Sequence, residues 1–335
     1  MPRSAGGISV EAERVETDTA PVRSHWKPIV ALLLVTPFLT ELLSGSLPAP
    51  KFFQPQLFLF LATVGYGFPI LLLREFAVRH RLGILGLLAL GLVYGIFNEG
   101  VIAKTFYLVA NVPVRNFDGY GYAGGIAIPW AVTISIWHAL HSFLYPVVAV
   151  YYFFPGHRES PWLNWKGIIL LAIPTVVLGT LIFFSHGNDR AAGLPAHFIL
   201  MAGLSGLLIW LATKLPAAPA LDGDGALKLS AVFWGGLAFL LLIFVPVLLA
   251  GVKFPAMIFY GYYVLTFGWM SWMTGRQASL STTTVLLFAL GDDSLLALVG
   301  LAGGIGQMNI LKLVTNAFFL AVFIWLFMRL RKAAH

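Results

Sequence analysis

The sequence has little charge and no cysteine. Only 10% of its 335 residues are Asp, Glu, Lys or Arg, whereas soluble domains carry about 25%. A chain this poor in charge cannot form a surface that water solvates, which excludes a soluble enzyme, a disordered regulator and a nucleic-acid-binding protein. The absence of cysteine excludes disulfides, thiolate metal sites, cysteine nucleophiles and S-palmitoylation.

Apolar residues make up 59% of the chain and recur in segments of about 20 residues, each long enough to cross a bilayer as a helix. The sequence therefore predicts an all-α polytopic membrane helix bundle of about ten transmembrane helices, with the lipid bilayer as its main partner. In the ninth segment Gly291, Asp292 and Asp293 fall near the middle, so it is two half-helices, a re-entrant segment or a true span. The predicted spans are residues 28–47, 55–74, 82–103, 127–153, 167–184, 196–214, 230–250, 254–273, 281–302 and 309–330.

Residues 1–26 differ from the rest because they contain four acidic residues and no apolar stretch. A signal peptide has the opposite pattern, so we interpret 1–26 as a disordered cytoplasmic tail that precedes a transmembrane domain of residues 27–335. With ten crossings, 15 of the 21 Lys and Arg residues lie on the side of this tail. The positive-inside rule then predicts a multi-pass protein of the plasma membrane with both termini in the cytoplasm.

The longest loop between predicted spans runs from residue 104 to about residue 126 and is rich in aromatic residues and glycine. Tyrosine favours the membrane interface, so an interfacial aromatic belt is one interpretation of this loop. An aromatic-rich lid over a site on the outer side is the other.

Ionisable side chains at membrane depth are costly, so each one is a candidate functional residue. Glu41 lies near the outer end of the first span, as a site ligand or as a carboxylate that reaches the headgroups. Asn98 and Glu99 lie near the outer end of the third span among glycines. A carboxyl group in that position suits a general base or a proton carrier, and pairing of Glu99 with Lys104 is the structural alternative.

The histidines and the two adjacent aspartates complete the set. His138 and His141 share one face of the fourth span and could relay protons, bind a metal or form structural hydrogen bonds. His197 begins the sixth span and either caps that helix or belongs to the site. Asp292 and Asp293 mark a water-filled cavity for protons or cations, or a helix break close to water. The sequence leaves the cofactor undetermined, with a divalent metal as one option.

Three of these segments resemble the CPBP family of intramembrane proteases, which includes prenyl-protein endopeptidases and bacteriocin-processing proteins. The segment Tyr94–Gly100 is similar to its Glu-Glu helix, with Asn98 at the first glutamate, and Trp137–His141 is similar to its Phe-x-x-x-His helix. His197 matches the last histidine. The resemblance implies that Glu99 and the histidines activate a water for peptide cleavage. The chain is also similar to uncharacterised bacterial multi-pass membrane proteins.

Three functional hypotheses follow from these residues. The first is an intramembrane hydrolase with Glu99 as base, the histidines orienting water or binding metal, and Asn98 steadying the oxyanion. The second is a proton- or cation-coupled transporter that uses the aspartates and a histidine relay. The third is a non-catalytic subunit of a membrane complex. The substrate and any partner subunits are undetermined, and the sequence contains no H-E-x-x-H, G-x-S-x-G or Walker motif.

Overall fold

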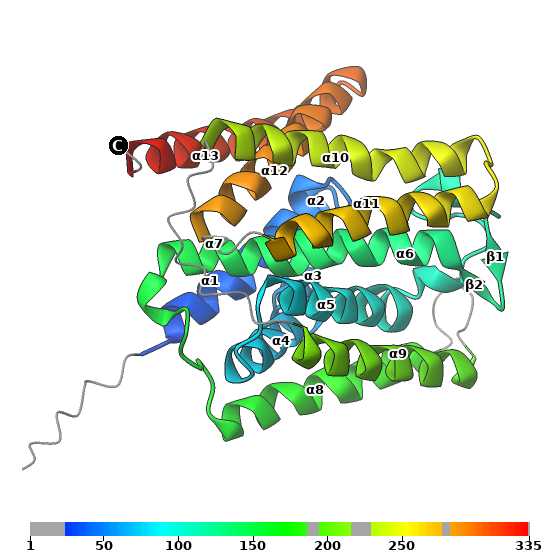
Figure 1. Cartoon of the computed structure of the whole chain (residues 1–335), viewed down its shortest axis with the longest axis horizontal. Coiled ribbons are helices and arrows are strands. Elements are labelled where there is room, and N and C mark those ends of the chain that lie inside the picture. The colour runs from blue at the N-terminus through cyan, green and yellow to red at the C-terminus, as the bar shows by residue number, and fades with distance from the viewer. Residues whose placement is uncertain (1–23, 186–193, 216–228, 277–281, 334–335) are drawn as a thin grey trace, which may run out of the picture.

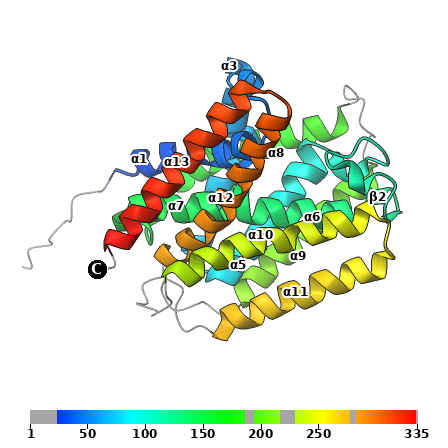
Figure 2. The same cartoon turned by 90° about the horizontal axis from the view of Figure 1, so that it is seen from above.

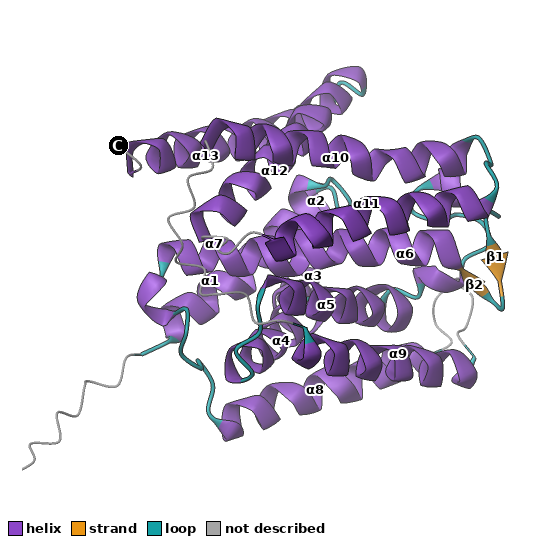
Figure 3. Ribbon diagram, in the orientation of Figure 1, coloured by secondary structure: helices purple, strands orange, loops and turns teal. Residues whose placement is uncertain are grey.

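A computed structural model describes residues 24–185, 194–215, 229–276 and 282–333. The described chain is a bundle of helices with one small β-hairpin (Figures 1 and 3). Most of the predicted tail, residues 1–23, lies outside the described residues. The predicted all-α polytopic bundle is confirmed.

Nine helical stretches of the described chain are long and apolar enough to cross a membrane. They match nine of the ten predicted spans to within a few residues. The eighth predicted span corresponds to helix α11 (Ala256–Arg276), which is of similar length but carries several Tyr, Gly and Trp residues that lower its hydropathy. The nine stretches are Trp26–Leu43, Pro55–Arg79, Ile84–Ile102, Ile128–Phe153, Trp165–Phe184, Pro195–Lys214, Ser230–Gly251, Thr282–Gly306 and Ile310–Lys332.

The first and last described helices place the two ends of the described chain at the same end of the bundle. Figures 1 and 2 both show the start of α1 (Trp26–Pro37) and the end of α13 (Ile310–Ala333) opposite the β-hairpin. An even number of crossings produces this arrangement, so α11 completes a set of ten.

Four stretches that cross the bundle contain a π-helical segment within the described residues, and all four segments border the polar interior. In such a segment one extra residue enters the helical turn, which is frequent at functional sites. Pro69 accompanies η2, because its nitrogen cannot donate to the carbonyl of Gly65; that carbonyl accepts the Tyr94 hydroxyl instead, at 2.8 Å. The interrupted stretches are α1–η1 (Phe38–Leu43), α3 (Pro55–Phe60)–η2 (Leu61–Gly65)–α4 (Gly67–Arg79), α5 (Ile84–Gly95)–η3 (Ile96–Ile102) and α6 (Ile128–Trp137)–η6 (His138–Leu144)–α7 (Tyr145–Phe153).

Helix α5 lies against α6 and η6 at the centre of the bundle, and glycine makes this close approach possible. A Cβ atom at Gly95 would lie 2.6 Å from the Cα of Ser135, and one at Gly91 would lie 2.6 Å from the Cα of Ala139. Both distances are too short for a side chain, so only glycine fits at these positions. The contact brings η3, which follows α5, beside the start of η6.

The ninth predicted span is a true span. Helix α12 (Thr282–Gly306) is one continuous helix of 25 residues, and it packs against α7, α10 (Leu229–Gly251) and α13. Gly291 faces the backbone of Phe233 on α10. The alternatives of two half-helices and of a re-entrant segment are therefore wrong. The aspartates are buried inside the bundle and do not break the helix.

Residues 103–127 fold into a compact segment at the end opposite the termini, which we call the cap. It contains η4 (Thr105–Tyr107), η5 (Arg115–Phe117) and a hairpin in which β1 (Tyr122–Ala123) pairs with β2 (Ile126–Ala127). Phe106, Tyr107 and Phe117 are each at most 1% exposed. These aromatic side chains pack on the helices of the bundle, Tyr107 against Phe183 and Phe117 against Trp130 and Phe259, which an interfacial belt would not require.

The remaining elements complete the chain without contributing to the polar interior described below. They are α2 (Ala49–Phe52), η7 (Pro155–His157), α8 (Trp165–Phe184) and α9 (Pro195–Lys214).

Candidate functional site

Two groups of buried polar side chains meet at the π-helix η6. The first, which we call the Glu99 cluster, lies toward the cap. The second, the Asp292 cluster, lies between η6, α7 and α12. The Glu99 cluster consists of Thr40, Glu41, Tyr66, Tyr94, Asn98, Glu99, Thr105, His138 and Ser142, and the Asp292 cluster consists of His141, Tyr145, Asp292 and Asp293.

Glu99 and His138 form the centre of the Glu99 cluster. Glu99 Oε1 lies 3.0 Å from His138 Nε2, and the two residues are 9% and 3% exposed. The second carboxylate oxygen of Glu99 accepts the hydroxyl of Thr105. That hydroxyl oxygen in turn accepts the indole N–H of Trp130 at 2.9 Å. Both oxygens of this carboxylate therefore have a partner, and the carboxylate fastens η3 to the cap and to η6.

The opposite nitrogen of His138 contacts a hydroxyl. His138 Nδ1 lies 2.6 Å from Ser142 Oγ, which is fully buried and lies 3.1 Å from Thr40 Oγ1. The imidazole thus joins a carboxylate on one side to a pair of hydroxyls on the other. A ring held in this way can take a proton from one neighbour and give one to the other.

Glu41 and Asn98 occupy the edge of the same cluster. Glu41 accepts the hydroxyl of Tyr66, and the rings of Tyr66 and Tyr94 lie 6.3 Å and 5.6 Å from that of His138. Asn98 Nδ2 donates to the Tyr94 hydroxyl at 2.8 Å. The amide thereby holds Tyr94, which differs from the role of oxyanion donor in the hydrolase hypothesis.

His141 is the centre of the Asp292 cluster. Its Nε2 atom lies 3.5 Å from Asp292 Oδ2 and 3.6 Å from Asp293 Oδ1. The ring is fully buried and stacks on Trp137 with a centroid separation of 3.8 Å. Tyr145 donates its hydroxyl to Asp292 Oδ2 at 2.6 Å. Two carboxyl groups and one imidazole therefore share a space from which water is excluded.

This second cluster is incomplete as a hydrogen-bonded network. His141 Nε2, Asp292 Oδ1 and Asp293 Oδ1 are buried and have no hydrogen-bond partner within the described part of the chain. Burying a polar or charged group without a partner is costly. The cluster can lower that cost by holding a proton or a cation. A metal site of three or more His, Asp or Glu ligands is absent from the described residues.

His197 lies apart from both clusters. Its Nε2 atom lies 2.9 Å from the carbonyl of Gly124, and its Nδ1 atom accepts the backbone N–H of Leu194 at 3.1 Å. Its ring stacks on Tyr107 with centroids 5.0 Å apart. Both ring nitrogens are therefore occupied by backbone groups. The residue fastens the start of α9 to the cap, and Glu99, His138 and His197 do not converge on one point.

Lys104 does not pair with Glu99, which was the structural alternative for that carboxylate. Lys104 Nζ donates to the carbonyl of Ser185 at 2.9 Å. Burial lowers the pKa of Lys104, and it raises the pKa of the nearby Tyr107 hydroxyl, which donates to the carbonyl of Gly100 at 2.7 Å. The ammonium group therefore binds the cap to the end of α8. The partners of Glu99 are His138 and Thr105.

Several contributors were not predicted as site residues. Tyr66 and Thr40 lie on segments remote in sequence from the residues that they contact, so no local pattern identifies them. Thr105 follows Glu99 closely but lies beyond the end of η3, so helical spacing does not identify it. A further buried ion pair, Arg74 with Glu75 at 2.8 Å, lies at the opposite end of the bundle. Arg74 also donates to three backbone carbonyls of the 157–160 loop. This pair therefore anchors a loop through the backbone carbonyls that Arg74 binds.

Comparison with known proteins places the chain in a family. Residues 30–333 match the model of a family described as an uncharacterized membrane protein family, and the chain belongs to that family. No curated protein and no solved structure matches it. The expected likeness to multi-pass membrane proteins of this kind is confirmed, whereas the family match gives no support to the resemblance to CPBP proteases.

Proposed function

We propose that the protein is a proton-coupled membrane transporter in which the Glu99 cluster and the Asp292 cluster each bind protons. In this proposal the Glu99 cluster exchanges protons with the capped side of the membrane, the outer side if both termini are cytoplasmic. The Asp292 cluster, near the middle of α12, binds the coupled proton. The transfer of a proton between the two clusters is then the step at which access changes from one side of the membrane to the other.

The observation that carries this proposal is the position of the two histidines on η6. His138 contacts Glu99 at 3.0 Å, and His141, three residues later, lies within 3.6 Å of both Asp292 and Asp293. One turn of π-helix therefore contacts three carboxyl groups from two other helices. Buried carboxylate and histidine chains of this kind are typical of proton pathways in pumps and transporters.

The two clusters are adjacent and are not joined by a continuous chain of hydrogen-bonding side chains. Thr40 Oγ1 lies near both Ser142 Oγ and the backbone carbonyl of His141, at 3.1 Å and 3.4 Å. The ring of His141 points instead to the aspartates. A rotation of this ring would move a proton from one cluster toward the other, and a step that requires such a movement can be gated.

The experiment that tests this function needs no substrate. Purified protein is reconstituted into liposomes on a solid-supported membrane, and rapid pH jumps are applied while the current is recorded. A proton that binds inside the bilayer moves charge and gives a transient current. We expect a transient current from the wild-type protein. Each of the single variants Glu99→Gln and Asp292→Asn should reduce this current strongly.

Two controls make the result decisive. Glu159→Gln removes a carboxylate whose side chain is 75% exposed, and it should leave the transient unchanged. Protein-free liposomes give the background. A wild-type transient no larger than this background, or one that persists in both cluster variants, would show that the clusters do not bind protons from either side.

A hydrolase is the second candidate, because Glu99, His138 and Ser142 follow one another at 3.0 Å and 2.6 Å. This is the order of an acid, a base and a serine nucleophile. A fluorophosphonate probe tests it directly. Labelling that disappears in Ser142→Ala supports a hydrolase, and labelling that is absent or unchanged in that variant removes this candidate.

A further inference from the structure

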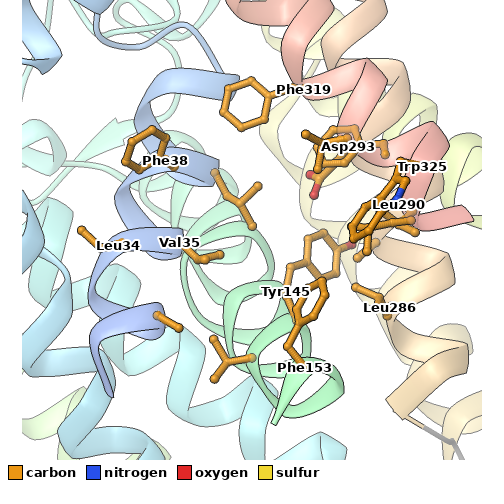
Figure 4. Close-up of a pocket in the computed structure, with 18 of the residues that line it drawn as sticks. Leu34, Val35, Phe38, Tyr145, Phe153, Leu286, Leu290, Asp293, Phe319 and Trp325 are labelled. Atoms are coloured by element: carbon orange, nitrogen blue, oxygen red, sulfur yellow. The ribbon is translucent and has the colours of Figure 1, made fainter. Parts of the chain in front are cut away.

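An apolar pocket with a single carboxyl group lies between α1, η1, α7, α12 and α13. Its volume is about 590 Å³, within the range of ligand pockets. Figure 4 shows Asp293 facing the pocket together with Tyr145, and aromatic rings surround them. The other lining residues are apolar side chains, including Val35, Phe38, Phe153, Leu290, Phe319, Phe323 and Trp325.

The pocket is open to the lipid-facing surface of the bundle. Several of its lining residues are also partly exposed on that surface, among them Phe153 at 44% and Trp325 at 48%. In a bilayer these side chains contact hydrocarbon. A ligand therefore reaches Asp293 from within the membrane, and it must itself be soluble in lipid.

Asp293 selects the charge of that ligand. The residue is 3% exposed, and its Oδ1 atom has no hydrogen-bond partner among the described residues. A buried carboxylate attracts a cation strongly because water does not screen the interaction. Aromatic rings add to this preference through their negative faces. The rings of Phe153 and Trp325 already face one cation, with the guanidinium of Arg329 5.9 Å and 5.6 Å from their centroids.

We propose that this pocket binds a lipophilic cation, an amphiphilic or aromatic molecule with one positive charge, and that the cation and a proton compete for Asp293. The proposal names the substrate class of the transporter. The exchange of one cation for one proton keeps the charge at Asp293 constant. The exchange rests on the proposed function, whereas the binding of the cation does not.

The groups around Asp293 determine how pH acts on the pocket. His141 of η6, Asp292 of α12 and Tyr145 of α7 are the titratable groups beside it. Helix α10, which also packs on α12, contains no ionisable residue. The pocket-lining residues from α1, η1 and α13 are not ionisable; Glu41 of η1 is bonded to Tyr66, and Arg329 of α13 lies over two lining rings. Acidification that protonates Asp293 removes the negative charge from the pocket and should displace the cation.

The test is equilibrium binding of tetraphenylphosphonium to the full chain in lipid nanodiscs, with empty nanodiscs as the blank. We expect saturable binding to the wild type at about pH 8, and an affinity at least about tenfold lower at about pH 5. Asp293→Asn should lower the affinity at about pH 8 to a similar extent. Val35→Trp, which narrows the pocket from α1, should weaken binding without removing a charge. Glu159→Gln, the exposed carboxylate, should leave the affinity unchanged.

The proposal fails if binding does not exceed that of empty nanodiscs or is equal in the wild type and Asp293→Asn. It also fails if 1-dodecanol binds while tetraphenylphosphonium does not, since the pocket then accepts a neutral chain. Asp293-dependent binding without pH-jump currents would overturn the proposed function and leave the cation pocket standing. pH-jump currents without Asp293-dependent binding would overturn the cation pocket and leave the proposed function standing.

Discussion

The two polar clusters on either side of η6 contain the same kinds of side chain but differ in how completely these are bonded. In the Glu99 cluster each oxygen of the Glu99 carboxylate has a partner, and both nitrogens of His138 are in contact. In the Asp292 cluster one atom of each of three residues has none among the described residues. Both clusters lie inside the bundle, so the main difference between them is whether their polar atoms are paired.

A satisfied cluster contributes to holding the helices together, whereas an unsatisfied one is costly until a further group joins it. The Glu99 cluster links η3, η6, α6 and the cap through side chains, and the same bonds serve structure and proton transfer. The Asp292 cluster links η6 to α12 mainly through weaker contacts of 3.5 Å and 3.6 Å. We infer that its missing partner is mobile, a proton or a cation, and that the comparison can be tested with single substitutions.

The largest expected effect is that of removing the close approach on which the Glu99 cluster depends. Gly95→Val should destabilise the protein by about 3 kcal/mol, because its Cβ would overlap the backbone of Ser135 and push α5 away from α6. The contact between Glu99 and His138 should be lost as well. Unfolding in detergent and the pH-jump current measure the two consequences.

A matched glycine provides the control for this change. A Cβ atom at Gly203 on α9 would point into open space, with no neighbouring group of the described chain within 4 Å. Gly203→Val should therefore leave stability and current close to those of the wild type. Equal losses in the two variants would mean that the close approach of α5 to α6 does not matter for the cluster.

Truncation of the carboxylate in the satisfied cluster should have the next largest effect. Glu99→Ala leaves His138 Nε2 and the Thr105 hydroxyl without their partner, and we expect a loss of about 2 kcal/mol. Glu99→Gln keeps the shape and one acceptor, so its loss should be about half as large. Unfolding free energies of the two variants in the same detergent provide the measurement, and a neutral effect of Glu99→Ala would show that the cluster does not hold the helices together.

The unsatisfied cluster should respond with the opposite sign. Asp293→Asn removes a buried carboxyl group whose Oδ1 atom has no hydrogen-bond partner among the described residues, and it should stabilise the resting protein by about 1 kcal/mol at neutral pH. The exposed control Glu159→Gln should change stability by less than about 0.5 kcal/mol. If Asp293→Asn destabilises the protein as Glu99→Gln does, the two clusters are alike and the inference of a missing partner is wrong.

The sequence predicts the spans well because twenty-residue apolar segments leave few alternatives in a bilayer. It also identifies the ionisable residues of both clusters, because an ionisable side chain within such a segment is costly and is therefore a candidate functional residue. It does not predict that α12 is continuous. Adjacent aspartates in an apolar helix suggest a break, but here the fold buries them against η6 and α7, and only the tertiary structure shows that.

The grouping of the site residues is the part that the sequence could not provide. The hydrolase hypothesis predicts Glu99, His138 and His197 as one group, but the sequence does not give the direction of a side chain around its helix. His197 faces the cap and bonds to Gly124. The division of His138 and His141 between two clusters arises from the π-helix, which turns residues three apart toward different neighbours.

The smallest expected effect comes from a pair of histidines outside both clusters. Replacing one of them removes its contribution from pH measurements on the clusters. His25 Nδ1 lies 2.8 Å from His157 Nδ1 at the end of the bundle where the chain termini lie. Burial, followed by the repulsion of His157, lowers the pKa of His25 below its usual value of 6.5. The folded state therefore binds fewer protons than the unfolded state, so this contribution to stability is complete above about pH 6.5 and is lost as the pH falls below it. His25→Gln should reduce the acid sensitivity of unfolding slightly, and unfolding in detergent above and below pH 6.5 measures this difference.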